Sequence, residues 1–352
     1  MPIPSETDRS DLIRAFLLES VAAHPRDLVS TAVSHFGITR QAIHKHLKNL
    51  IAQGMMEAEG QTRQRQFRLV DSQQSWTYNI AGGLEEDRAW RLELLPLLKH
   101  LPKNALDIWE FCFTEIFNNA IDHSEGRTIR VLLKQNAVAA SVEIVDDGIG
   151  IFEKLRAAVG LSDERHVALE LSKGKLTTDP AKHTGQGIFF TSRLMDTFGI
   201  WSGSVLLRHD FGREDDWVIT SNVIVSGTKV GMKLRHGIER TCKSIFDQYS
   251  SGDDYGFTKT VVPVDLARYG GEQLISRSQA KRLMARVDQF KTVVLDFHGI
   301  DRVGQAFADE IFRVYSRSHP DIEIIPKNAT PEVQQMIQRA RTQWASELPG
   351  SI

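Results

Sequence analysis

The chain has 352 residues, 41% hydrophobic and 25% charged, a composition that excludes disordered and collagen-like proteins. Its 43 Lys and Arg against 45 Asp and Glu give a net charge of -2, which excludes a protein that is basic throughout and coats nucleic acid. No apolar run approaches the roughly 18 residues of a membrane span, and the polar start lacks the apolar core of a signal peptide. The two cysteines, Cys112 and Cys242, have no partners at metal-binding spacing. We therefore expect a cytoplasmic protein of two or three domains, without disulfides.

The first part of the chain has the pattern of three helices followed by two short strands. Ser10–Asp11 is expected to cap the first helix, which stops before Pro25. Gly37 suits the left-handed residue that ends the second helix, and Thr39 is expected to cap the third. This order predicts a winged helix-turn-helix in residues 1–70.

The expected third helix and hairpin present side chains suited to DNA. From Thr39 to Arg68 there are six basic residues against two acidic ones, a local charge of +4. Arg and Gln on a helix can bind base edges, whereas Lys suits phosphates. The candidate DNA-binding residues are Arg40, Gln41, His44, Lys45, Lys48, Arg63 and Arg65. A protein-interaction module with an ordinary solvated face is the alternative, since a fold does not fix a function.

The rest of the chain alternates helices and strands. Residues 71–90 are polar, contain a Gly pair, and are expected to form a connector. Residues 91–235 include a long apolar helix and strands rich in β-branched residues, and residues 236–352 alternate shorter strands and helices. The predicted fold class is multidomain α+β: a winged helix, then a two-layer α/β sandwich, then a small α/β domain.

The long helix carries the first chemical motif. Glu115 and Asn119 are four residues apart, so their side chains lie on one helix face. A carboxylate and a carboxamide on one face can hold Mg²⁺ and orient a water molecule. Alone, the pair is more typical of an ordinary solvent-facing surface.

A second motif follows a strand. Asp146 at the strand end can accept a hydrogen bond from an exocyclic amine, while Gly148 and Gly150 allow the backbone to approach a flat ring. Further along, Thr228 lies between two apolar stretches, and its hydroxyl could support the Asp146 end of a pocket. Taken singly, these are an Asp-Gly turn and a hairpin turn.

Two glycines open a later helix. Gly185 and Gly187 precede an apolar helical stretch, where free N–H groups and the positive helix end suit a phosphate. The stretch lacks the Lys-Ser/Thr ending of a Walker loop, and the glycines after Asp146 do not complete a Rossmann fingerprint.

In this order and spacing, the motifs resemble the Bergerat-type ATP-binding domain of the GHKL superfamily, which includes gyrase, heat-shock chaperones, histidine kinases and anti-sigma-factor kinases. The resemblance covers about residues 100–235. It implies that ATP and Mg²⁺ are the cofactors, that Asn119 is the Mg²⁺ ligand and that Asp146 recognises adenine. It also implies that residues 151–184, which include Lys173, Lys175 and Lys182, form a lid over ATP. The other implied binding residues are Gly148, Gly150, Gly185, Gly187 and Thr228.

Glu115 separates the subfamilies that the resemblance includes. Histidine kinases usually have Asn there, whereas ATP-hydrolysing members and anti-sigma kinases have Glu. Glu115 is therefore the expected catalytic residue, a general base that activates water or a serine hydroxyl. No phosphoacceptor-histidine helix precedes the domain, so histidine autophosphorylation is not expected.

Residues 236–352 resemble a STAS-like domain. The resemblance rests on the stretches 274–281, 292–301 and 303–310. Anti-sigma kinases phosphorylate a serine in a STAS partner, in the loop that corresponds here to residues 301–305, which contains no Ser or Thr. Phosphorylation within this chain is therefore not expected, and Ser276 and Ser278 are expected to cap a helix.

These features favour a transcription regulator in which the nucleotide state of the ATP-binding domain controls a DNA-binding winged helix and a STAS-like domain, and slow ATP hydrolysis resets that state. The expected partners are ATP, double-stranded DNA and a protein bound by the STAS-like domain, with no membrane; homodimerisation stays open. Two alternatives remain: an anti-sigma-type serine/threonine kinase acting on a separate protein, and a scaffold that binds ATP without hydrolysing it.

Overall fold

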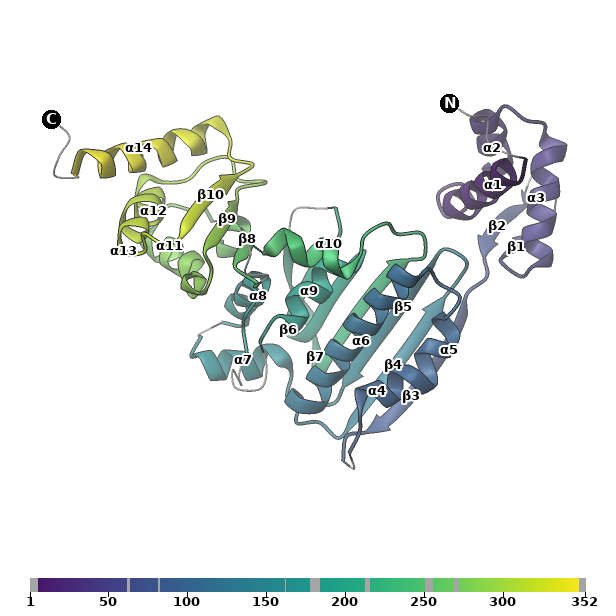
Figure 1. The fold of residues 1–352 in the computed structure, drawn as a ribbon, viewed down its shortest axis with the longest axis horizontal. Coiled ribbons are helices and arrows are strands. Elements are labelled where there is room, and N and C mark those ends of the chain that lie inside the picture. The colour runs from purple at the N-terminus through teal and green to yellow at the C-terminus, as the bar shows by residue number, and fades with distance from the viewer. Residues whose placement is uncertain are drawn as a thin grey trace. The chain divides into compact units, whose positions relative to one another are not determined.

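The computed structural model describes residues 6–61, 64–81, 83–161, 163–177, 184–212, 216–250, 256–268 and 272–347 (Figure 1). The chain divides into two compact units. The smaller comprises Met1–Trp76 with the strand ends Leu132–Val142 and Leu234–Gly237, and the larger comprises the remainder. No described helix is both long and hydrophobic enough to cross a lipid bilayer.

Three helices and a hairpin form the N-terminal part. They are α1 (Glu6–Ser20), α2 (Leu28–Phe36), α3 (Arg40–Ala52), β1 (Met56–Glu59) and β2 (Gln66–Leu69), with β1 antiparallel to β2. Buried Leu17, Leu28 and Leu47 belong to their common core. As predicted, Thr39 caps α3, its side chain accepting a hydrogen bond from the Ala42 N–H. The expected start at Ser10–Asp11 is wrong, because the polar residues before it continue the helix.

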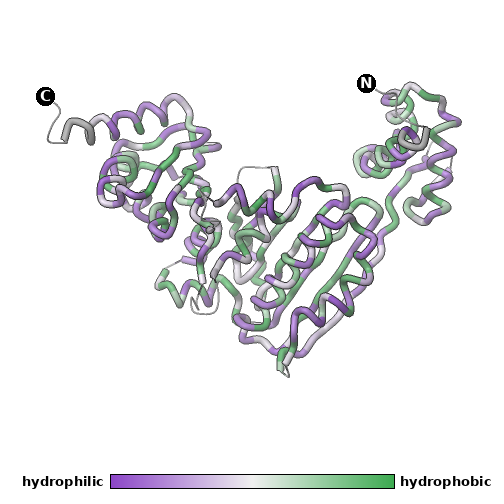
Figure 2. The backbone as a smooth tube through the Cα atoms, in the orientation of Figure 1, coloured by the Kyte–Doolittle hydropathy of each residue, from purple (hydrophilic) through white to green (hydrophobic). Residues whose placement is uncertain are grey.

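A five-stranded sheet with the order β3-β4-β5-β7-β6 is the centre of the next part. Its strands are β3 (Ser72–Asn79), β4 (Thr128–Gln135), β5 (Ala139–Asp146), β6 (Thr197–Asp210) and β7 (Asp216–Arg235). Strands β4 and β5 are largely hydrophobic (Figure 2). They alternate more and less buried positions, as expected for a sheet with one face against a core.

Helices pack on this sheet in two groups. One group is a continuous helical stretch, α4 (Glu86–Ala89), the π-helical η2 (Trp90–Leu94) and α5 (Leu95–Leu98), followed by α6 (Lys103–His123). The other is α7 (Ile151–Val159), α8 (Glu164–Lys173) and α9 (Gly187–Leu194). Helices α6 and α9 lie side by side on the sheet (Figure 1).

Two segments differ from the sequence predictions. The expected connector 71–90 contributes strand β3 and the start of the helical stretch; β3 is a mostly exposed edge strand, so its composition is polar. Thr228, which taken singly fits a hairpin turn, lies instead within one continuous strand, β7. Strand β7 pairs with β6 from Lys233 to Asp216, and it stays one strand although the register shifts around Gly203 of β6.

The last part contains a three-stranded parallel sheet, β10-β9-β8. Its strands are β8 (Lys259–Pro263), β9 (Thr292–Asp296) and β10 (Glu323–Lys327), after α10 (Cys242–Phe246) and η3 (Asp247–Tyr249). Its helices are η5 (Val264–Ala267), α11 (Arg277–Met284), η6 (Val287–Gln289), α12 (Gln305–Asp309), η7 (Glu310–Tyr315), α13 (Ser316–Ser318) and α14 (Pro331–Glu347). As predicted, Ser276 caps α11, in a capping box with Gln279, whereas Ser278, also expected as a cap, lies within the helix.

Candidate functional site

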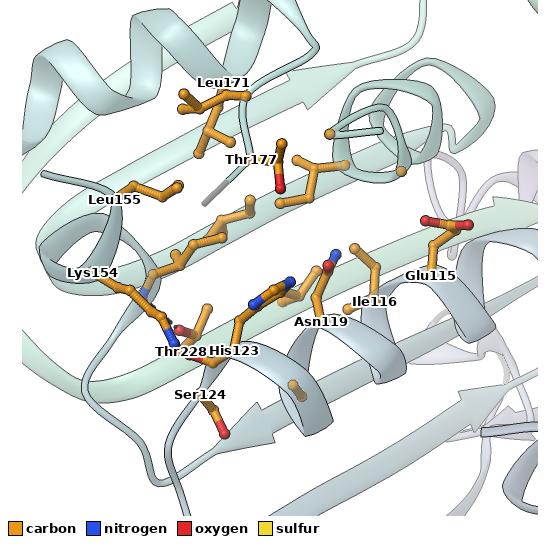
Figure 3. A pocket seen from close by; sticks show the side chains of 18 of the residues that line it. Glu115, Ile116, Asn119, His123, Ser124, Lys154, Leu155, Leu171, Thr177 and Thr228 are labelled. Carbon is orange, nitrogen blue, oxygen red and sulfur yellow. Dashed lines mark hydrogen bonds between the residues drawn. The ribbon is translucent and has the colours of Figure 1, made fainter. Parts of the chain in front are cut away.

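One stripe of helix α6 carries polar residues at every fourth position. Glu115, Asn119 and His123 share a face because they are four residues apart, and all three line one cavity (Figure 3). The opposite face is apolar and buried, with Trp109 and Phe113 fully covered. His123 was not among the predicted binding residues, although its spacing after Asn119 is the sequence signal for it.

The cavity has a volume of about 240 Å³ and mostly apolar walls. Helix α6 forms one side, the strand residues Ile144, Ile200 and Val230 form the floor, and Leu155 and Leu171 of helices α7 and α8 lie across it. Six of the predicted site residues line it: Glu115, Asn119, Asp146, Gly185, Gly187 and Thr228. An apolar cavity with few polar groups is the usual form of a small-molecule site.

Asp146 forms the buried carboxylate of the cavity. Its side chain is only 6% exposed, at the end of β5. Its Oδ1 accepts hydrogen bonds from the N–H groups of Gly148, at 3.0 Å, and Thr228, at 3.1 Å. Burial raises the pKa of Asp146, and the two backbone hydrogen bonds lower it in part. The Thr228 side chain also hydrogen-bonds this carboxylate. A carboxylate can accept about four hydrogen bonds, so Asp146 retains capacity for one from a ligand.

Thr228 joins two sides of the site. Its backbone donates to Asp146, while its Oγ1 accepts a hydrogen bond from the Ile151 N–H at 3.0 Å. Gly227 makes this possible: its φ is +70°, and a Cβ there would lie 2.1 Å from the Asp146 carbonyl oxygen. Gly227 was not predicted as a site residue, because its contact with Asp146 joins positions far apart in the sequence and is visible only in the folded structure.

Gly148 and Gly150 are not among the residues that line the cavity. A Cβ on Gly148 would lie 2.0 Å from the Ser124 carbonyl oxygen, at the end of α6. A Cβ on Gly150, where φ is +89°, would lie 2.5 Å from the Ser202 Oγ. The protein's own packing is therefore sufficient reason for both glycines, and their approach to a flat ring stays a prediction.

The other end of the cavity is the start of helix α9. A Cβ on Gly187 would lie 1.9 Å from Glu115 Oε2, so the carboxylate of α6 packs directly against the first residue of α9. The N-cap residue Gln186 makes no side-chain capping bond. Gly185, with φ of +70°, packs against the backbone of Lys175 and Leu176. Backbone N–H groups at a helix start favour anions, which agrees with the phosphate site that the glycines predict.

Lys154 is a further cavity residue, which the sequence motifs did not indicate. Its ammonium group donates to the His123 carbonyl oxygen at 2.8 Å and to Glu125 Oε1 at 2.9 Å, which joins helix α7 to the end of α6. Among the predicted lid lysines, Lys173 and Lys175 contact the C-terminal part instead of lining the cavity. Lys182 lies outside the described residues.

The residues present fit a nucleotide better than a free metal ion. Among the described residues, no group of three or more His, Cys, Asp or Glu side chains is placed to hold a metal. Mg²⁺ usually keeps several water molecules and is held by one or two protein oxygens together with substrate phosphates. The Asn119 side-chain oxygen, in the same cavity as the start of α9, suits that arrangement.

The predicted DNA-binding residues of α3 form an exposed set. All five of them are solvent-exposed: Arg40, Gln41, His44, Lys45 and Lys48. Arg65, on the hairpin, is also exposed. Arg63 lies outside the described residues. Arg68 is 2.9 Å from Glu57 and 3.8 Å from Glu59, so the hairpin's acidic residues offset its charge.

Comparison with protein families identifies two of these parts. Residues 83–205 match the family described as histidine kinase-like ATPase domain, and residues 279–334 match a STAS-like domain of unknown function (DUF4325). The chain therefore contains a histidine kinase-like ATPase domain followed by a STAS-like domain. An ATPase domain of this kind implies nucleotide binding, usually with Mg²⁺. Neither match includes helices α1–α3, and no curated protein matches the chain.

Proposed function

We propose that this protein is a transcription regulator whose ATPase domain binds Mg²⁺-ATP and hydrolyses it slowly. In this proposal the nucleotide state controls the DNA affinity of a winged helix, residues 1–70, and the partner binding of the STAS-like domain. The observation that carries it is a single cavity with Asp146 at one end and with Glu115 and Gly187 at the other. ATP can act as a switch only if it binds the two conformations differently.

Each end of the cavity has a distinct task in this proposal. The Asp146 carboxylate accepts a hydrogen bond from the adenine amine, and the apolar walls contact the ring. Asn119 binds Mg²⁺, and the start of α9 binds phosphate oxygens. Glu115 accepts the proton of the attacking water. Mg²⁺-ATP, when bound, supplies the phosphoryl group and the metal charge that offsets the phosphates.

DNA binding rests on the exposed face of α3. Its arginine, glutamine, histidine and two lysines are all free of the core, whereas Ile43, Leu47 and Leu50 are buried. A helix with one buried face and one basic, polar face is suited to a DNA groove.

A protein kinase acting on a separate protein is the second candidate. Glu115 would also serve as the base for a serine hydroxyl. The STAS-like domain offers no acceptor in its 301–305 loop, and the Ser276 hydroxyl accepts a hydrogen bond from the Gln279 N–H as the cap of α11. The acceptor would therefore be in another protein.

Binding and turnover of Mg²⁺-ATP by the full chain test the proposal. Asp146→Asn replaces one carboxylate oxygen by an amide donor, so binding measured by calorimetry should weaken by about 10- to 100-fold, the value of a hydrogen bond to a charged group. Glu143→Gln is the matched control, because Glu143 lies on the same strand but pairs with Lys229 outside the cavity. Glu115→Gln should bind ATP normally and release no phosphate.

The same preparations separate the two candidates. With labelled ATP, the regulator releases free phosphate and labels no protein, whereas the kinase labels a partner in a cell extract. Wild-type protein that binds no ATP, or an Asp146→Asn variant that binds as tightly as wild type, would overturn the assignment of the cavity.

A further inference from the structure

Residues 171–177 lie between the nucleotide cavity and the STAS-like domain. Leu171, Leu176 and Thr177 line the cavity. The residues between them, Lys173 to Lys175, contact the last part of the chain. Residues 171–177, here named the bridge segment, thus contact both the nucleotide cavity and the STAS-like domain.

Lys173 provides the buried contact of the bridge segment. It is only 1% exposed, and its ammonium group donates to Glu170 Oε1 and to the Ala285 carbonyl oxygen, both at 2.7 Å. Burial lowers the pKa of Lys173 and raises that of Glu170, while each charge favours the ionised form of the other. A buried ammonium group is tolerated only with such partners, so the contact restricts how α8 can sit on the STAS-like domain.

Thr260 adds a hydrogen bond at the end of helix α8. Its Oγ1, fully buried on strand β8, donates to the Lys173 carbonyl oxygen at 2.7 Å. Lys173 is the last residue of α8, and the final carbonyl groups of a helix have no partner within the helix. A side chain of the C-terminal sheet therefore caps the helix that covers the cavity.

Gly174 and Lys175 pack into an aromatic cluster. A Cβ on Gly174, where φ is +82°, would lie 2.6 Å from the Phe257 ring. The Lys175 ammonium group donates to the Gln289 carbonyl oxygen at 2.8 Å and lies 4.5 Å from the centre of the Phe290 ring. These contacts fix the backbone just before Leu176 and Thr177 enter the cavity wall.

The bridge segment also supports the phosphate end of the cavity. Gly185 packs on the backbone of Lys175 and Leu176, where a Cβ would be 2.7 Å from the Lys175 carbonyl carbon. A shift of the bridge segment therefore displaces the glycine turn before α9, as well as the side chains over the cavity.

We infer that the bridge segment couples the STAS-like domain to the ATP site, so that contacts with Thr260, Ala285 and Gln289 raise the affinity for ATP. This inference rests on the proposed function, because it assigns the cavity to ATP. Coupling free energies are reciprocal. A protein that binds the STAS-like domain and shifts these contacts changes ATP affinity, and ATP changes the affinity for that protein by the same factor.

Two substitutions weaken the bridge contacts from opposite sides. Thr260→Val removes the hydroxyl that caps α8, and Lys175→Met removes the hydrogen bond to Gln289 while keeping the aliphatic stem. Each should raise the Kd for Mg²⁺-ATP, measured by calorimetry on the full chain, by fivefold or more, the lower end of typical coupling. Circular dichroism and melting without nucleotide identify any variant that fails to fold.

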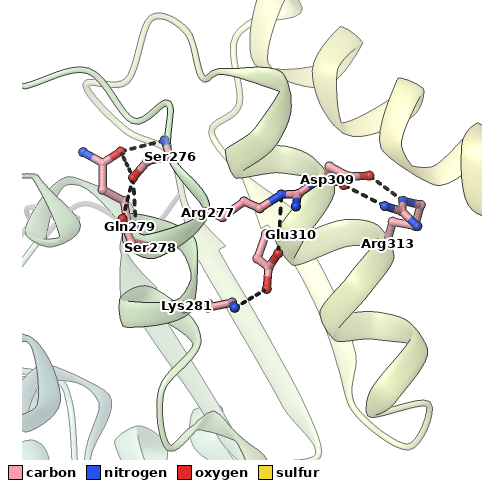
Figure 4. Close-up of polar contacts among 8 residues, drawn as sticks. All are labelled: Ser276, Arg277, Ser278, Gln279, Lys281, Asp309, Glu310 and Arg313. Carbon is pink, nitrogen blue, oxygen red and sulfur yellow. Dashed lines mark hydrogen bonds and ion pairs between the residues drawn. The ribbon is translucent and has the colours of Figure 1, made fainter.

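Each substitution has a matched control. Thr260→Ser keeps the hydroxyl. Lys281→Met makes the same change as Lys175→Met, but Lys281 pairs with Glu310 at 3.8 Å, within a charged network of α11, α12 and η7 (Figure 4). That network joins α11, α12 and η7 within the STAS-like domain. Both controls should bind ATP within twofold of wild type.

Hydrogen exchange provides a readout that reduced stability alone does not imitate. In wild type, saturating Mg²⁺-ATP should slow amide exchange in α8 and also in residues 258–263 of the STAS-like domain. The Thr260→Val, Lys175→Met double variant should keep the first effect at saturation and lack the second.

These experiments distinguish a failure of the coupling from a failure of the proposed function. If wild type binds no Mg²⁺-ATP, the proposed function fails and the coupling fails with it. If wild type binds but the variants have an unchanged or lower Kd, or if ATP leaves residues 258–263 unaffected in wild type, only the coupling is overturned.

Discussion

The ammonium group of Lys173 donates a hydrogen bond to the carbonyl oxygen of Ala285, although 112 residues separate them. Lys173 lies in the segment that matches the histidine kinase-like ATPase domain, and Ala285 lies in the segment that matches the STAS-like domain. The two domains are thus joined through a fully buried charged side chain at the end of helix α8. Helix α8 of the ATPase domain therefore contacts the STAS-like domain directly.

Gly187→Ala should slow turnover strongly without unfolding the protein. The added Cβ would overlap Glu115 Oε2, which can swing away because it is the end of a flexible side chain. Displacing a catalytic group by about 1 Å costs on the order of 100-fold in rate. Phosphate release should fall by about that factor while the melting temperature changes little.

Gly237→Ala is the control for this substitution, since its Cβ would meet no atom within 4 Å. Wild-type phosphate release by Gly187→Ala would show that the position of the Glu115 carboxylate is not critical.

Thr228→Val should destabilise the domain, whereas Thr228→Ser should not. The hydroxyl is buried and accepts the Ile151 N–H, so valine leaves that donor without its partner. An unsatisfied buried donor costs about 1–3 kcal/mol. Urea unfolding should show this decrease for valine and a much smaller one for serine; equal stability of the two variants contradicts the role of the hydrogen bond.

Asp147→Asn should lower stability at neutral pH but not in acid. Hydrogen bonds from the Thr128 and Arg127 N–H groups, and from the Thr128 hydroxyl, lower the pKa of Asp147 below its ordinary value of 3.8. The unfolded chain then binds the proton more readily, so the stabilisation is complete above pH 3.8 and is lost as the pH falls through the folded pKa.

The difference in urea midpoint between Asp147→Asn and wild type should therefore be constant above that pH and shrink below it. Asp321→Asn, at another exposed carboxylate, serves as the control. A difference that persists unchanged into acid would show that the charge of Asp147 contributes nothing.

Lys45→Ala and Lys48→Ala should each weaken binding to duplex DNA across sequences. Both side chains are exposed on α3, where they suit phosphates. Removing a lysine that binds one phosphate should reduce the slope of log K against log salt by about 0.9. Fluorescence anisotropy over a salt series measures this, with Lys99→Ala as the exposed control; unchanged slopes would favour a protein-interaction role for this helix.

Local rules determined much of the site in advance. The four-residue spacing of Glu115 and Asn119 guaranteed a shared face once their helix formed, because helical geometry depends only on neighbours along the chain. The glycines at the start of α9 and the Thr39 cap could likewise be predicted from the sequence, since turn and capping preferences arise within a few residues. The order of the motifs was sufficient for the family resemblance, which the two domain matches confirm.

Contacts between distant residues required the tertiary structure. A side chain at Gly148 would clash with the end of α6, and one at Gly227 would clash with the backbone of Asp146. In both cases the backbone segments in contact are far apart in the sequence, so the sequence pattern does not reveal the clash. The polar edge strand β3 resembles a linker until β4 pairs with it. Lys is usually a surface residue, and Lys173 is buried only because α8 packs against β8 and Ala285, since burial is a property of the assembled fold.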